Sequence, residues 1–192
     1  MSNVIPHNWD VPQAFRGRFG THAGRQRVMT ADGHLLIVLH QLPHPDDPGE
    51  RSARLFWRKP DGTWKSTGSS ATNIGALKAH VEEFDQAVDA MENRAEKASS
   101  ASEWFAVLHE SAPLLRSARN MSATLQEARD LAKTDQPLIA VRDTAQDIER
   151  AIELIHGHAR SGLDFTIAKS AEDNAHHTKH VLESQHRLNL IA

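Results

Sequence analysis

The final third of the chain, from Pro137 to Ala192, has the sequence of one very long helix. It contains no further proline, and its only glycines are Gly157 and Gly162. A helix over this range would be roughly 80 Å long, because each residue adds about 1.5 Å. A helix of that length needs partner helices to cover its apolar stripe. The pattern continues to the last residue without a closing Gly or Asn cap, and we expect another segment to follow it.

Two shorter helices precede this one. From Thr72 onward, apolar residues alternate at spacings of three and four, the heptad pattern of coiled-coil-like bundles. The first stripe consists of Ile74, Leu77, Val81, Phe84, Val88, Met91, Ala95 and Ala98. Serines at 99–102 then interrupt the pattern and supply a new N-cap. We therefore predict three helices, at about 73–98, 103–133 and 136–192.

Two features within these helices depart from a regular pattern. Pro113 lies inside the second helix, where it either kinks the helix or begins a new one capped by Ser111. In the third helix the apolar stripe becomes small or polar between Ala168 and Thr178. This change indicates that the helix passes from one packing environment into another.

Residues 1–72 have the pattern of β-structure. Asp-Gly turns at 32–33 and 61–62 separate apolar runs of strand length. About four strands are predicted, at 25–30, 35–42, 53–59 and 64–67. So small a meander should pack on the helices. The predicted fold class is therefore α+β. A small antiparallel β-meander, in a β-rich subdomain at 1–72, packs on a bundle of long helices at 73–192, which ends in a very long C-terminal stalk helix.

Composition excludes several function classes. The chain has no cysteine, which excludes disulfides, cysteine-ligated zinc and thiol catalysis. Because the chain has a net charge of −3, no nucleic-acid partner is expected. The arginines at 16, 18, 25 and 27 are interpreted as charges that protect an edge strand. Nucleophile-elbow, Walker and dinucleotide-binding motifs are absent from the sequence, so we predict no enzyme activity. No stretch of 18 uninterrupted apolar residues is present to span a membrane.

Histidine supplies the most conspicuous potential metal ligands, with 13 in the chain. His176 and His180 are four residues apart, so they share one face of a helix and can chelate Zn²⁺, Ni²⁺ or Co²⁺. The alternative interpretation is a polar helix surface with adventitious affinity for transition metals.

The order of elements, together with three short motifs, resembles the cytoplasmic portion of the CorA family of divalent-cation channels, which chiefly carry Mg²⁺. The motifs are Arg25–Met29 with Gly33–His40, the proline-containing segment Ala112–Arg116, and the helix end Arg187–Ala192. The resemblance covers most of the chain. It implies that the long helix continues into membrane-spanning helices that this chain lacks. The expected location is the cytoplasmic face of the inner membrane, with the fragment itself soluble.

The resemblance also implies partners and site residues. It implies a homo-oligomer, a pentamer in the full-length protein, whose stalk helices form a regulatory funnel leading to the pore. Gln185 and Leu188 would face the mouth of the pore. Asp143 and Asp147 would be the nearest counterparts of carboxylates that bind regulatory Mg²⁺ between subunits, the alternative being a solvated helix face with local ion pairs. The family's N-terminal domain is much larger than 72 residues, and a glutamine at the pore mouth weakens a hydrophobic gate.

A second function class fits the same residues. The helices could form a freestanding soluble oligomer of coiled-coil type that acts as a scaffold or interaction module. About 20 apolar residues encoded directly after Ala192 would indicate the transporter, whereas a stop codon would indicate the scaffold.

Overall fold

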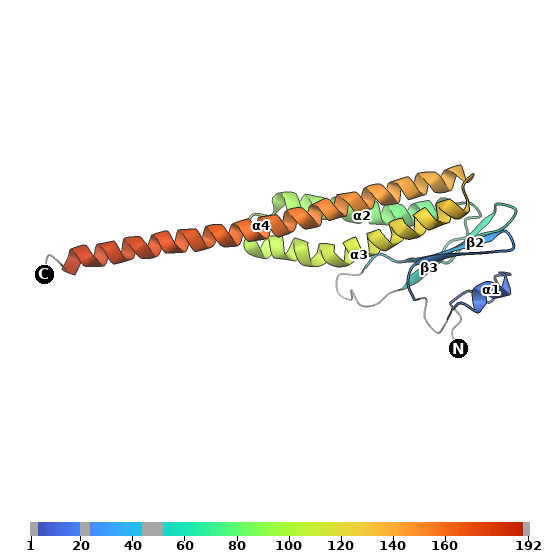
Figure 1. The fold of residues 1–192 in the computed structure, drawn as a ribbon, viewed down its shortest axis with the longest axis horizontal. Coiled ribbons are helices and arrows are strands. Elements are labelled where there is room, and N and C mark those ends of the chain that lie inside the picture. The colour runs from blue at the N-terminus through green and yellow to red at the C-terminus, as the bar shows by residue number, and fades with distance from the viewer. Residues whose placement is uncertain (1–3, 20–23, 44–51, 190–192) are drawn as a thin grey trace.

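The computed structural model describes residues 4–19, 24–43 and 52–189, with side chains placed as far as His186. It has the predicted α+β fold: a four-stranded antiparallel sheet packs on three long helices (Figure 1). The last helix, α4, runs along the whole bundle and projects well beyond it at the C-terminal end.

The sheet is the predicted meander. Its strands are β1 (Arg27–Ala31), β2 (His34–His40), β3 (Ala53–Arg58) and β4 (Trp64–Ser66), hydrogen-bonded in that order. Asp32 and Gly33 both have positive φ, 50° and 75°, which is the backbone that a tight turn between two antiparallel strands needs.

Both faces of the sheet are covered. Leu35, Ile37 and Leu39 of β2 point to the helices, whereas Leu36 and Val38 belong to a second hydrophobic cluster on the opposite face. Successive side chains of β2 therefore enter the two clusters in turn. This explains why its sequence is a continuous apolar run, since a strand buried on both faces needs no polar positions.

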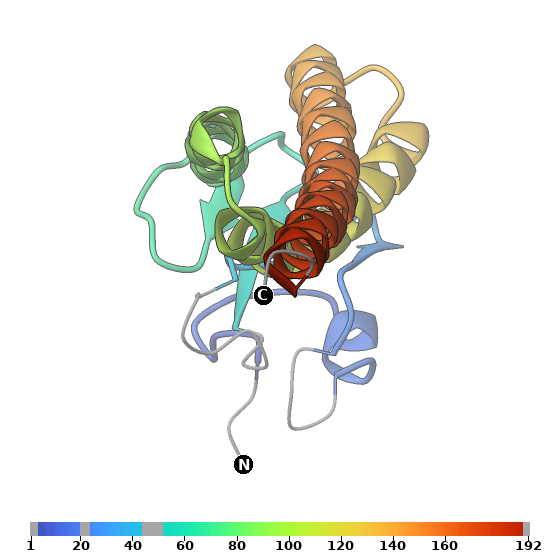
Figure 2. The same cartoon turned by 90° about the vertical axis from the view of Figure 1, so that its left-hand side faces the viewer.

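The second cluster joins the other face of the sheet to the N-terminal segment. The sequence did not predict a helix in that segment. A short helix, α1 (Gln13–Arg16), lies on the side of the sheet away from the long helices (Figure 2). Trp9 stacks on Trp57 of β3 with ring centroids 5.6 Å apart, and Phe15 is fully buried. The part of the chain before residue 72 is therefore β-rich, as predicted, with one additional short helix.

The three long helices are α2 (Gly75–Lys97), α3 (Ala101–Leu131) and α4 (Gln136–Asn189). The predicted stripe of α2 is buried from Ile74 to Ala95. Ser100 caps α3 in a capping box, in which Glu103 accepts from the backbone N–H of Ser99 and Ser100. These hydrogen bonds lower the pKa of Glu103 to about 2.

Pro113 does not begin a new helix, because α3 is continuous through it. Ser111 is fully buried and is not an N-cap; its hydroxyl donates to the carbonyl of Leu108 at 3.1 Å. That hydroxyl is also 2.8 Å from Nδ1 of His156, which links α3 to α4.

One hydrophobic core joins the sheet to the helices. It contains Leu35, Ile37 and Phe56 of the sheet together with the apolar stripes of α2, α3 and α4. Arg58 at the end of β3 also pairs with Asp135, just before α4, at 2.9 Å. The proposed subdomain boundary at residue 72 stays a prediction.

Candidate functional site

The part of α4 that leaves the bundle is the candidate functional site. We call residues 164–189 the distal segment; at about 1.5 Å per residue it is about 40 Å long. Every side chain from Ile167 to His186 is exposed, so none of the described residues covers this part of the helix. The change of packing environment that the sequence predicted is therefore confirmed, and it begins just after Leu163.

Contacts with α3 hold the base of the distal segment. The ring of Trp104 lies against Gly162 and is 5.1 Å from the ring of His158, centroid to centroid. Leu163 makes the last apolar contact of α4 with the core. Gly162 was not predicted as a contact residue, although a glycine inside a helical pattern is a signal for close packing.

The distal segment carries an exposed apolar stripe beyond the bundle. The buried stripe of α4 ends with Ile152, Ile155 and Ala159. At about 100° per residue, Ile167, Val181 and Gln185 lie within about 60° of the direction of Ile152, whereas the stripe drifts by about 80–100° at Ala171 and Thr178. Ile167 is 54% exposed and Val181 is 42% exposed. An exposed apolar stripe on a helix is typical of a surface that another helix covers.

The predicted pore residues lie at the far end of this segment. Gln185 is exposed and lies on the stripe. Leu188 belongs to α4 by its backbone, but its side chain lies outside the described part of the chain. Their role at a pore mouth stays a prediction.

His176 and His180 lie on a different face from the stripe. Their ring centroids are 4.5 Å apart, and both side chains are exposed, so the predicted proximity is confirmed. Nδ1 of His180 is also 4.0 Å from Glu183. The pair can offer two imidazole ligands to a metal ion, with water completing the coordination.

Asp143 and Asp147 lie on the part of α4 that belongs to the bundle. Asp143 pairs with Arg142 at 3.0 Å and Asp147 pairs with Arg150, the local ion pairs of the alternative interpretation. Asp147 also faces acidic groups of α2: the pKa of Asp85 is raised by burial first and then by neighbouring carboxylates, including that of Asp147.

These candidate ligands do not form one metal site within a single chain. Asp147 and His176 are separated by about 44 Å along α4, at 1.5 Å per residue. Within the described ranges, no three His, Asp or Glu side chains converge on a point where a metal ion could be held. Metal binding by either pair stays a prediction.

None of the helices in the described part of the chain is both long and apolar enough to cross a membrane. No known sequence family matches the chain, and no curated protein matches it either.

A solved structure, however, matches the fold. The cytoplasmic domain of ZntB from Vibrio parahaemolyticus RIMD 2210633 superposes with a TM-score of 0.64, over 85% of this chain and 80% of that one. The chain has the fold of the ZntB cytoplasmic domain. The resemblance inferred from the sequence is therefore confirmed for the fold. Because the two sequences are 14% identical, the likeness to ZntB concerns the fold alone.

Proposed function

We propose that this chain is the cytoplasmic domain of a CorA-like metal-ion transporter, in which α4 forms a stalk that leads to a membrane pore. One observation carries the proposal: the distal segment presents exposed apolar side chains beyond the bundle, and none of the described residues packs on it. The shared fold with ZntB supports it. A helix of this kind fits a stalk at the cytoplasmic face of the inner membrane better than a surface helix of a monomer.

In this proposal the missing partner is a second copy of the chain. Several distal segments arranged around one axis would cover their stripes mutually, as helices do in a coiled coil. The CorA-like arrangement is a pentamer, and α2, α3 and the sheet would then surround the stalk as a regulatory funnel.

The proposed cargo is Mg²⁺ or another divalent cation. A ring of Gln185 side chains would offer amide oxygens to the water shell of the ion, which Mg²⁺ gives up reluctantly. A ring of Leu188 side chains, one turn further along, would close the path by excluding water.

The two proposed metal-binding pairs outside the pore differ in the metal they would bind and in their position on α4. His176 and His180 would bind transition metals on the outer face of the stalk, because they lie away from the stripe. Asp143 and Asp147 would need carboxylates from a neighbouring copy to hold Mg²⁺, because each already pairs with an arginine of its own helix.

Single cysteines in the full-length protein test this arrangement, since the chain has none of its own. Val181 lies on the stripe, and Glu183, two residues on, lies on the opposite side of the same helix. Mild oxidation should cross-link Val181→Cys between copies and leave Glu183→Cys uncross-linked. Equal cross-linking of both variants, or of neither, would contradict the packed stalk.

A freestanding scaffold of coiled-coil type would give the same cross-links, so a second readout is needed. The transporter should remain in the membrane fraction after alkaline extraction, whereas the scaffold should be released. Release of the cross-linked protein would favour the scaffold.

A further inference from the structure

A cavity lined by three arginines lies between the N-terminal part of the chain and the middle of α3. Its volume is 610 Å³, and Arg18, Arg25 and Arg27 line one side. Arg18 and Arg25 are exposed and form no ion pair with a carboxylate in the described ranges. Arg27 is half-buried, with its guanidinium 4.5 Å from the centre of the Phe19 ring.

The three guanidinium groups are close enough to repel one another. The pKa of Arg27 is lowered by burial first and then by the positive charges of Arg25 and Arg18. Among the described residues that line the cavity, Glu127 of α3 is the one acidic side chain, against the exposed guanidinium groups of Arg18 and Arg25. An anion bound between the arginines would relieve this repulsion, and guanidinium groups match phosphate oxygens in geometry.

Other residues around the cavity offer hydrogen-bonding groups rather than charge. Gln26 is 7% exposed, and its Nε2 donates to the carbonyl of Ser117 at 3.1 Å, which ties this edge of the cavity to α3. Asn120 and Thr124 of α3 also line the cavity, and the side chain of Asn120 is exposed.

We propose that this cavity binds a small organic phosphate, a phosphate ester whose organic part carries hydroxyl groups. Arg18 and Arg25 would hold the phosphate, and the side-chain amide of Asn120 would accept a hydrogen bond from a ligand hydroxyl. The volume is in the range of small-molecule pockets, about 300–1,000 Å³, and far exceeds what a phosphate ion fills. The inference does not depend on the proposed transport role.

A nucleic acid would also offer phosphates, but the charge distribution favours a small ligand. The chain as a whole has a net charge of −3, whereas nucleic-acid binding needs an extended basic surface. Here three arginines line a single cavity.

Isothermal titration calorimetry of the chain with ribose 5-phosphate, ribose and inorganic phosphate tests the proposal. Ribose 5-phosphate should bind at least tenfold more tightly than inorganic phosphate, and ribose should not bind. Arg18→Gln and Arg25→Gln should each weaken binding by about tenfold, the effect of losing one charge-assisted hydrogen bond. Glu127→Gln should tighten binding several-fold, because it removes the one repulsive charge.

Arg116→Gln is the matched control, because Arg116 is an exposed arginine of α3 that does not line the cavity. It should leave the affinity unchanged. The proposal would be overturned if Arg116→Gln weakened binding as much as Arg25→Gln. It would also be overturned if inorganic phosphate bound as tightly as the ester, or if only a single-stranded RNA oligonucleotide bound.

Discussion

Gly162 of α4 lies so close to Trp104 of α3 that a Cβ atom added to it would be 2.5 Å from Cε2 of the indole. Only glycine lets the two helices approach at this level, just before α4 leaves the bundle. The contact therefore fixes the direction in which the distal segment projects.

The first prediction compares two glycines of α4. Gly162→Ala should lower the free energy of unfolding by about 1–2 kcal/mol, because overpacking against Trp104 outweighs the gain in helix propensity. Gly157 is exposed with no atom within 4 Å of an added Cβ, so Gly157→Ala should raise stability by up to about 1 kcal/mol. Urea unfolding measures both, and equal effects would show that Trp104 does not constrain this site.

A second prediction concerns the buried imidazole of His80 in α2. Burial, and then the positive charge of Arg54 at 3.3 Å, lower the pKa of His80 to about 4. The unfolded chain therefore binds more protons than the folded one between pH 6.5 and 4. Stability should be complete above pH 6.5 and fall by about 3 kcal/mol as the pH drops to 4.

Replacing this histidine isolates its contribution. His80→Leu should flatten the dependence of unfolding free energy on pH in that window, whereas His177→Gln, at an exposed position, should not. If the slope survived in His80→Leu, another group would be responsible for it.

The third prediction concerns the histidine pair of the distal segment. Ni²⁺ or Zn²⁺ should bind the chain with one ion per pair, and His176→Ala or His180→Ala should abolish most of this binding. His177→Ala, on a neighbouring face, is the control and should retain it. Titration calorimetry with each metal measures the affinity of the three variants. An equal loss of metal affinity in all three would show that binding is adventitious.

A fourth prediction concerns ion leak through the full-length protein. Leu188→Ala should raise the resting leak more than Gln185→Ala does, because in the proposed pore a leucine ring would close the path by dewetting. Ion-flux measurements on vesicles that contain either variant compare the two leaks. If Leu188→Ala left metal uptake unchanged while Arg187→Ala altered it, the stripe would be misassigned.

Local periodicity explains how much of the fold the sequence predicted. The heptad spacing from Ile74 to Ala95 and the Asp-Gly turn at Asp32 are short-range signals, and both are confirmed. The stacking of Trp9 on Trp57 was not predicted, because it joins segments that are distant in sequence and share no period.

The candidate site was only partly predictable for a related reason. Helical spacing places His176 beside His180, as the structure confirms. The change of packing environment along α4 was predicted from the loss of apolar residues between Ala168 and Thr178, and the structure places it slightly earlier, just after Leu163. The burial of His80 was missed, because histidine gives no signal of its environment in the sequence.

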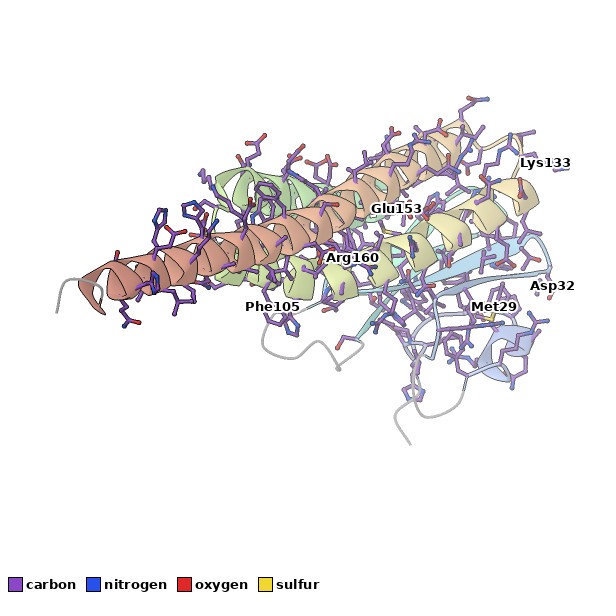
Figure 3. All side chains as sticks on the ribbon, turned by 60° about the vertical axis from the view of Figure 1, so that its left-hand side comes forward. Met29, Asp32, Phe105, Lys133, Glu153 and Arg160 are labelled. Carbon is purple, nitrogen blue, oxygen red and sulfur yellow. The ribbon has the colours of Figure 1, made fainter. Side chains whose placement is uncertain are left out.

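Divalent-cation uptake by the full-length protein in proteoliposomes tests the central claim most directly. Figure 3 shows the base of the bundle, near Lys133 and Asp32, at the end of the molecule opposite the C-terminal end of α4. The distal segment would therefore approach the membrane while the sheet stays away from it. We expect vesicles that contain the protein to take up Mg²⁺, or Zn²⁺, Ni²⁺ or Co²⁺, faster than empty vesicles do. A protein that does not enter the vesicle membrane, or one that enters it and carries none of these ions, would contradict it.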